Sequence, residues 1–149
     1  MSDFKISKHI SRLAAVQIMY QKDITGLELN GIIDNFVNFY LNHEEEYKGI
    51  NLKFFKSLIS HFQDEIDFTG IVSRNIDNGK SFSSPSVIAS CIIKVAIIEM
   101  MFEKTDIPVI INEYVELSKD FIDKKGVNFT NAILDKISKQ IERKCQEKA

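Results

Sequence analysis

The sequence predicts an all-α fold: a single domain over residues 1–149 with about seven helices around a central apolar helix. Apolar residues recur at helical spacing in almost every segment, and convincing strand alternation is found in none. Six glycines and two prolines are too few for the many tight turns of a β-sandwich or barrel. Residues 85–103 are apolar on nearly all sides, which predicts a buried central helix. A chain of 149 residues can bury such a core without disulfides or a structural metal.

Four amphipathic helices are expected before residue 77. The first ends near Gly26, and the second closes before the polar segment HEEEYKG (43–49). Gly70 weakens the expected continuity of the fourth helix. The expected core-facing residues of the first helix are Ile6, Ile10, Leu13, Tyr20 and Ile24, and those of the second are Leu29, Ile33, Phe36, Val37 and Tyr40. Those of the third helix are Phe55, Leu58, Ile59 and Phe62. Those of the fourth are Ile66, Ile71, Val72 and Ile76.

Prolines mark the starts of the next two helices. After a loop over residues 77–85, Ser84 precedes Pro85, and a proline at the first helical position costs little because its missing N–H would have no partner there. A helix is therefore expected over residues 85–103. The segment DIP (106–108) predicts a sixth helix in the same way, running to about Phe121.

The segment NFTNAILDKI (128–137) predicts the seventh helix, after a break at DKKG (123–126). Asn128 is the expected N-cap, although Asn131 stands where a capping box has Glu or Gln. Phe129 falls on the same helical stripe as Ile133, and Asn131 lies roughly 120° from the centre of that stripe. Capping and packing would explain the segment, whereas contact of Phe129 and Asn131 with a partner is the alternative that the residues leave open.

Composition limits the compartment and the class of protein. Contents of 44% hydrophobic and 27% charged residues are typical of a globular protein. Cys91 lies in an apolar segment and Cys145 in a charged one, so we expect no disulfide and a reducing, cytoplasmic compartment. The N-terminus lacks the apolar stretch of a signal peptide. Lys94 and Glu99 interrupt the most apolar segment, which favours a buried helix over a membrane span.

The net charge of −2 conceals a segregation of charge along the chain. Residues 1–22 carry four bases and one acid, a balance of +3, and residues 117–149 carry eight bases and five acids, again +3. Residues 23–116 carry seven bases and fifteen acids, a balance of −8. If the two ends pack side by side, the protein presents one basic face, which favours a polyanionic partner.

The residues of an enzyme active site cannot be assembled from this sequence. The three histidines have no ligand-spaced partners of the HExxH or CxxC kind, and no phosphate-binding GxxxxGK[ST] or GxGxxG motif occurs. No GxSxG motif occurs either, and Cys91 has the surroundings of a packing residue. We therefore expect no enzymatic activity, no cofactor and no metal site.

The first helix carries the most informative polar residues. Lys5, Lys8, His9 and Arg12 fall within roughly 100° of one another, in a row suited to contacting successive phosphates. Gln17 and Tyr20 continue the helix, and a tyrosine can stack on an unpaired base. The alternative is an ordinary surface helix whose Tyr20 belongs to the core stripe.

Three segments together resemble the NusB transcription antitermination family: SRLAAVQIMYQKDITG (11–26), IINEYVELSKDF (110–121) and NFTNAILDKI (128–137). The likeness covers essentially the whole chain. It implies a small all-α protein of two packed helical subbundles that binds the boxA element of nascent ribosomal leader RNA. Its implied partners are the ribosomal protein NusE and the transcription elongation complex. The resemblance also places Phe129 and Asn131 near the bases, with Arg12, Gln17 and Tyr20 across from them.

Two features depart from the family pattern. The first helix of the family usually opens with an arginine-rich run, where this chain has SKHIS (7–11). Fewer full charges release fewer counterions, so weaker and less salt-sensitive RNA binding is expected. Lys124 and Lys125 stand where relatives often carry acidic residues, and they restore some of the lost charge.

The surface for NusE is the least defined part of the prediction, and Lys94, Glu99 and Glu103 on the central helix are its candidates. The family contains monomers and homodimers, so the oligomeric state stays open. One alternative function is a protein-interaction module that binds NusE and has lost useful RNA affinity. Another, the RNA-binding front of a ribosomal RNA methyltransferase, needs a catalytic domain that this chain lacks.

Overall fold

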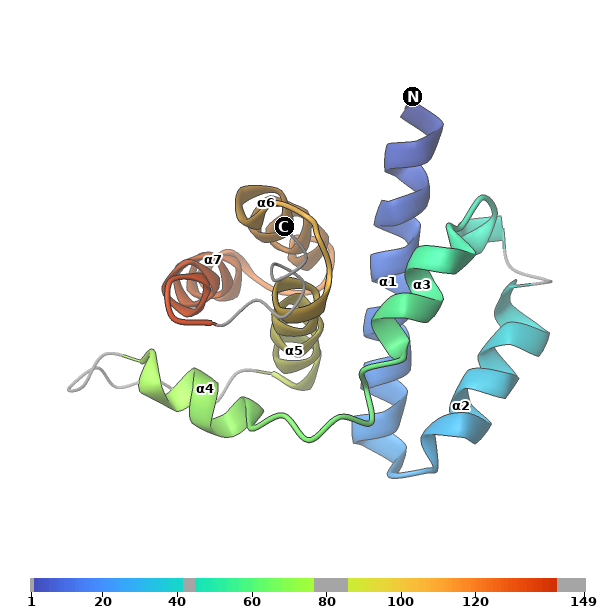
Figure 1. The fold of residues 1–149 in the computed structure, drawn as a ribbon, viewed down its shortest axis with the longest axis horizontal. Coiled ribbons are helices and arrows are strands. Elements are labelled where there is room, and N and C mark those ends of the chain that lie inside the picture. Colours follow the sequence, from blue (N-terminus) through green and yellow to red (C-terminus); the bar gives the residue numbers. More distant parts are fainter. Residues whose placement is uncertain (1, 42–44, 77–85, 142–149) are drawn as a thin grey trace. The chain divides into compact units, whose positions relative to one another are not determined.

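The structure, a computed structural model, describes residues 2–41, 45–76 and 86–141, with the side chains of the first helix described from Lys8 onward. Within these ranges all regular elements are helical, and seven of them are α-helices (Figure 1). The all-α prediction with about seven helices is confirmed. The chain divides into two compact units, Met1–Gln63 and Asp64–Ala149, each described in turn below. The single-domain organisation stays a prediction.

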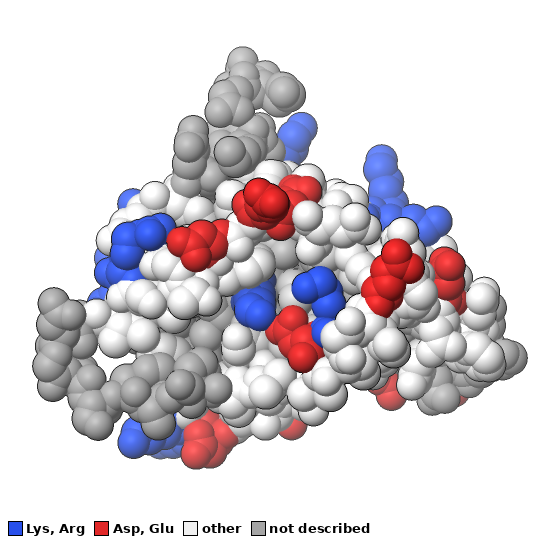
Figure 2. All heavy atoms as spheres, turned by 90° about the horizontal axis from the view of Figure 1, so that it is seen from below, with Lys and Arg blue, Asp and Glu red and all other residues white. Residues whose placement is uncertain are grey.

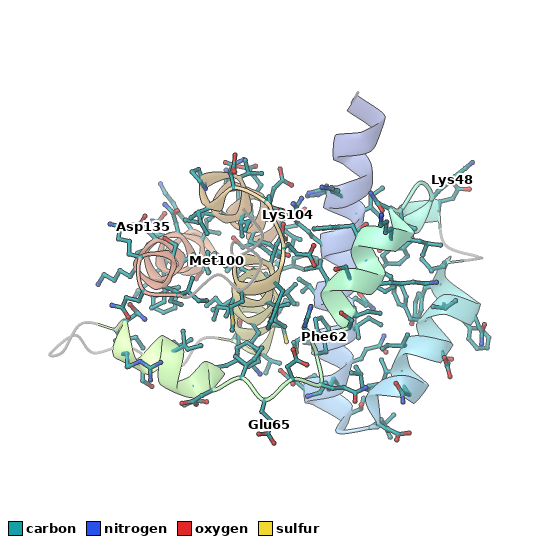
Figure 3. All side chains as sticks on the ribbon, viewed as in Figure 1. Lys48, Phe62, Glu65, Met100, Lys104 and Asp135 are labelled. Atoms are coloured by element: carbon teal, nitrogen blue, oxygen red, sulfur yellow. The ribbon has the colours of Figure 1, made fainter. Side chains whose placement is uncertain are left out.

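The first unit is built on α1 (Ser2–Thr25), which contacts α2 (Leu29–Asn35) and α3 (Leu52–Ile59). Gly26 ends α1 as expected, since its φ of 69° lies in the left-handed region that favours glycine. The second helix continues beyond its α-helical part as a π-helix, η1 (Phe36–Leu41), and a 3₁₀ turn, η2 (Glu45–Tyr47), precedes α3. Within this unit Lys48 projects outward beside η2 (Figure 3).

The buried face of α1 differs from the predicted one. Tyr20 and Ile24, expected on the core stripe, are 38% and 54% exposed. Ala14, Ala15 and Ile18 are instead fully buried. Alanines on a helix allow a neighbouring helix to approach closely, so packing centres on them and turns the larger Tyr20 and Ile24 outward. The expected stripe was therefore wrong at its C-terminal end.

Aromatic rings fill the core of the first unit. The Phe36 ring lies at the centre of a cluster, with ring centroids 5.4 Å from Tyr40, 5.0 Å from Tyr47 and 5.6 Å from Phe55. Stacked and edge-to-face pairs at such separations add stabilisation beyond their buried area. The cluster joins η1, η2 and α3, which fixes the segments that pack around α1.

The second unit contains α4 (Phe68–Arg74), α5 (Val87–Phe102), α6 (Ile107–Ser118) and α7 (Lys124–Ser138). Helices α5, α6 and α7 contact one another, and α4 contacts α7. The prediction of a buried apolar helix is confirmed, because ten residues of α5 are buried. Among them is Met100, whereas Asp135 lies on the outer side of α7 (Figure 3).

The predicted start of α5 was two residues too early. The Ser86 hydroxyl oxygen accepts the backbone N–H of Ala89 at 3.2 Å, so Ser86 is the N-cap and Val87 the first helical residue. Ser84 and Pro85 lie outside the described residues. For α6, Pro108 stands in the first turn as predicted.

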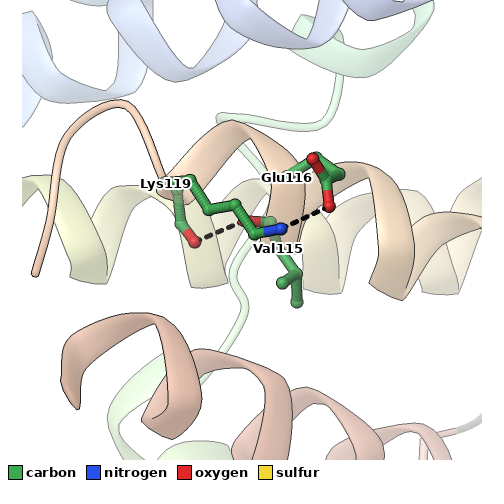
Figure 4. A network of polar contacts seen from close by, with 4 residues as sticks. Val115, Glu116 and Lys119 are labelled. Carbon is green, nitrogen blue, oxygen red and sulfur yellow. Dashed lines mark hydrogen bonds and ion pairs between the residues drawn. The ribbon is translucent and has the colours of Figure 1, made fainter. Parts of the chain in front are cut away.

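Helix α6 ends at Ser118, three residues before the expected Phe121. Two polar contacts mark its end (Figure 4). The Ser118 hydroxyl donates to the Val115 carbonyl oxygen at 2.7 Å, and Lys119 Nζ lies 2.7 Å from Glu116 Oε2. A serine hydroxyl that bonds to a backbone carbonyl competes with the helical ladder, which is consistent with the early end.

Two helices of the second unit begin with the same pattern, Asp-x-x-Gly. Asp67 Oδ1 accepts the N–H of Gly70 at 3.0 Å, and Asp123 Oδ1 accepts the N–H of Gly126 at 2.8 Å. A Cβ on Gly70 would lie 2.1 Å from Asp67 Oδ2, so glycine makes room for that capping carboxylate. Helix α7 therefore starts at Lys124, and the predictions of a break at DKKG and an Asn128 cap were wrong.

Replacing Asp123 by alanine should lower the free energy of unfolding by about 1 kcal/mol, because one N–H of the first turn of α7 loses its acceptor. Asn128→Ala should change it by less than about 0.5 kcal/mol, because Asn128 is exposed within α7 and caps nothing. Denaturant unfolding of the two variants tests the assignment. A larger loss for Asn128→Ala than for Asp123→Ala would restore the cap predicted from sequence.

Candidate functional site

The cations of α1 do not form the exposed row that the sequence predicts. The Arg12 side chain is only 2% exposed, and its guanidinium carbon lies 5.1 Å from the centroid of the Phe54 ring. Lys8 is half-buried, with Nζ 5.0 Å from the same ring. Both cations therefore lie within about 5 Å of the centre of one aromatic ring, which favours a cation–π contact for each. The side chain of Lys5 lies outside the described ones.

A hydrogen-bonded link between α1 and α3 holds Phe54 in place. The Ser11 hydroxyl donates to the Asn51 carbonyl oxygen at 2.8 Å, and Ser11 Oγ accepts the Asn51 N–H at 3.1 Å. Asn51 Oδ1 in turn accepts the N–H of Phe54 at 3.0 Å, which caps α3. Sequence reasoning missed Phe54, although Asn51 before an apolar run was a signal for a capped helix there.

The remaining α1 candidates point to different sides of the helix. At about 100° per residue, Gln17 lies roughly 180° from Lys8, and its Oε1 accepts the Tyr47 hydroxyl at 3.4 Å. His9 and Tyr20, by contrast, lie within about 20° of each other along α1. His9 is half-buried and Tyr20 is 38% exposed. The accessible pair on this helix is therefore His9 and Tyr20, with Lys8 at its edge.

In the second unit, the candidates lie in the first half of α7. Lys125 and Asn131 are exposed, and Phe129 is half-buried on the rim of the core face made by Ile133 and Ile137. Lys125 and Phe129 are four residues apart and share a side of the helix. Asn131 is roughly 160° from Phe129 about the helix axis, at about 100° per residue. The helix therefore offers an aromatic–cation pair on one rim of its exposed face and an amide on the other.

The residues proposed for a protein partner are not equally accessible. Glu99 is fully buried, and one of its carboxylate oxygens accepts the Tyr114 hydroxyl at 2.7 Å, so it cannot lie on a docking surface in this conformation. A buried carboxylate needs hydrogen-bond donors of this kind, and Glu99 is therefore an interior residue of the protein. Lys94 is half-buried, with Nζ 5.8 Å from the Phe68 ring centroid, and Glu103 caps the end of α5.

The charged surface is mixed in sign. On the face drawn in Figure 2, basic side chains stand in small groups with acidic side chains between them. The described residues contain no group of three or more His, Cys, Asp or Glu that could hold a metal ion. None of the helices in the described ranges combines the length and apolar character needed to cross a bilayer. Taken separately, the two units present scattered cations, exposed amides and partly exposed aromatics, groups that contact the phosphates and bases of single-stranded nucleic acid.

Comparison with known proteins gives one consistent result. The model of the NusB family matches residues 9–139. Transcription antitermination protein NusB of Rickettsia massiliae (strain Mtu5) is 30% identical over 96% of this chain and 99% of its own length. The protein of the same name from Bradyrhizobium diazoefficiens is 29% identical over 87% of this chain and 82% of its own length.

Proposed function

Because the chain belongs to the NusB family, we propose that it is an RNA-binding transcription antitermination factor. It binds the boxA element of nascent ribosomal leader RNA together with the ribosomal protein NusE, as part of the transcription elongation complex. The observation that carries this proposal is the match of nearly the whole chain to relatives named for antitermination.

Each unit supplies its own part of the RNA contact. In the first unit, Tyr20 offers a partly exposed ring to a base, and Lys8 and His9 lie toward the phosphates. In the second, Phe129 offers a half-buried ring one helical turn from Lys125. Asn131 can pair with the edge of a neighbouring base, since it lies on the other rim of α7. Arg12 is buried against Phe54 and supports the site through that packing, without contact to RNA.

A second candidate function is a protein-interaction module that binds NusE and has lost useful RNA affinity. The burial of Arg12 favours it, because only Lys8 and Lys22 then remain as partly exposed Lys or Arg side chains in the described part of α1, residues 8–25. Loss of a phosphate contact lowers affinity for every RNA sequence and flattens its salt dependence. The two functions differ in whether boxA RNA is bound at all.

Titration of a boxA RNA and a scrambled RNA of equal length, with and without purified NusE, tests the proposal. We expect weak binding by the protein alone and at least about a tenfold gain with NusE, corresponding to about 1.4 kcal/mol of coupling. The gain should be confined to boxA. Binding of NusE with no preference for boxA over the scrambled RNA would favour the interaction module.

A further inference from the structure

The second unit contains a hollow at the C-terminal ends of α4 and α7. Its volume is about 280 Å³, and it is lined by Arg74, Asn75 and Ile76 from the end of α4 and by Lys136, Lys139 and Gln140 from the end of α7. The two helices are in contact, so the same packing brings the two groups of residues together. The hollow is shallow and largely open to solvent, and it is separate from the candidates in the first half of α7.

The lining is basic and contains amide groups. Arg74 and Lys139 are exposed and Lys136 is half-buried. Lys139 Nζ lies 3.3 Å from Asp135 Oδ2, but both side chains are more than half exposed, at 73% and 57%. An exposed pair of this kind is weak and releases its lysine readily to a stronger anion. Three cations line the hollow, and the carboxylates near them are those of Asp135, beside Lys139, and Asp67, near Arg74.

One wall of the hollow is rigid. Asn75 is only 6% exposed, and its Nδ2 donates to the Ile71 carbonyl oxygen at 2.8 Å. The Arg74 guanidinium, whose planar fork matches phosphate oxygens, lies near the capping carboxylate of Asp67: a Cβ on Gly70 would be 3.1 Å from Arg74 Nη1 and 2.1 Å from Asp67 Oδ2. Cations near helix C-termini also offset the partial charge of the last carbonyls. That role needs no hollow.

The hollow lies on the same side of α7 as the expected base platform. Lys125, Phe129 and Lys136 fall within roughly 40° of one another about the helix axis. Eleven residues separate the two lysines, or about 16 Å at 1.5 Å per residue. A strand of RNA that meets Lys125 and Phe129 therefore has a continuous path along α7 to Lys136 and Arg74.

We propose that this hollow binds the phosphodiester backbone of the bound RNA, at nucleotides that flank those contacted by Phe129 and Lys125. The proposal rests on the proposed function and extends it from a local contact to a track along α7. The hollow contributes affinity without sequence preference, because phosphate contacts position a strand and base contacts specify it.

The test compares a boxA RNA with the same RNA carrying flanking nucleotides on both sides, each bound to the wild-type protein with NusE. Arg74→Gln should lower affinity for the flanked RNA about five- to tenfold and reduce its salt slope by about one unit. Its affinity for the short RNA should not change. Lys104→Gln is the matched control, since Lys104 is an exposed cation of the same unit that does not line the hollow. Thermal melting of both variants checks that they fold.

Four outcomes would overturn the proposal. Equal wild-type affinity for the two RNAs, with boxA still preferred over a scrambled sequence, would show that the hollow is unused while the proposed function stands. If Arg74→Gln and Lys104→Gln lose equal affinity for the flanked RNA, the loss reflects the overall charge of the protein and not a contact in the hollow. Thermal stabilisation by inorganic phosphate that Arg74→Gln abolishes, without any effect on RNA, would assign the hollow to a free phosphate. If neither RNA binds, both the proposed function and the proposed RNA contact along α7 are contradicted.

Discussion

Replacing Ile97 by aspartate is expected to abolish cooperative folding. Ile97 is fully buried in α5, between the buried residues Ala96 and Ile98. A carboxylate at this position loses its hydration and gains no hydrogen-bond or charge partner. This lowers the free energy of unfolding by several kcal/mol, even if the carboxylate takes up a proton. That loss approaches the 5–15 kcal/mol by which folded proteins are typically stable. Loss of the thermal transition, followed by circular dichroism, is the expected result.

Val109→Asp is the matched control for Ile97→Asp. Val109 is 44% exposed in the first turn of α6, where a negative charge interacts favourably with the helix N-terminus. Its midpoint of thermal unfolding should therefore stay within a few degrees of the wild-type value, which corresponds to less than about 0.5 kcal/mol. A normal melting transition for Ile97→Asp would mean that α5 is not the core of its unit.

Phe129→Ala is expected to produce the largest loss of RNA affinity from a single side chain. Loss of one stacked base should weaken binding to boxA RNA with NusE by about 1–3 kcal/mol. Because Phe129 is half-buried, the variant should also lose stability, but less than the roughly 3–5 kcal/mol typical of a fully buried phenylalanine. Titration and denaturant unfolding of the same preparation separate the two effects.

Ile133→Ala provides the comparison, since Ile133 is 2% exposed one turn further along α7. Its stability should fall by about 2–5 kcal/mol, while the folded fraction binds RNA normally. Asn131→Ala should barely affect folding and should narrow the difference between boxA and a scrambled RNA. If Phe129→Ala loses as much stability as Ile133→Ala and its RNA affinity follows the folded fraction, Phe129 is a core residue only.

The fold could be predicted from sequence because helical periodicity and the apolar segment 85–103 are local properties. The predictions were wrong where the role of a residue depends on the side chain that contacts it. Gly126 was interpreted as a helix breaker, yet it follows Asp123 at the spacing of a capping pair. The burial of Arg12 could not be foreseen, because it depends on Phe54, a ring that lies more than 40 residues along the chain and is placed by tertiary packing. Charge on a helical wheel shows which side a residue occupies, and it does not show which neighbour covers that side.

The exposure of several candidate residues was predicted better than their arrangement, and their role in binding stays a prediction. Tyr20, Lys125 and Asn131 are exposed as a binding role requires. Gln17 was expected near the bases with Arg12 and Tyr20, but its Oε1 accepts the Tyr47 hydroxyl, a contact that depends on the conformation of η2. The hollow beside Arg74 had no signal in the sequence, since it forms only where the ends of α4 and α7 meet.

Cross-linking of a boxA RNA substituted with 4-thiouridine tests most directly whether the two proposed surfaces contact RNA. The reagent joins a base to protein groups in contact with it, and mass spectrometry of the digested complex with NusE identifies the peptides. We expect cross-links in the peptide of α1 that contains Tyr20 and in the peptide of α7 that contains Phe129. Cross-links confined to α6, or to NusE alone, would contradict an RNA-binding role for these surfaces.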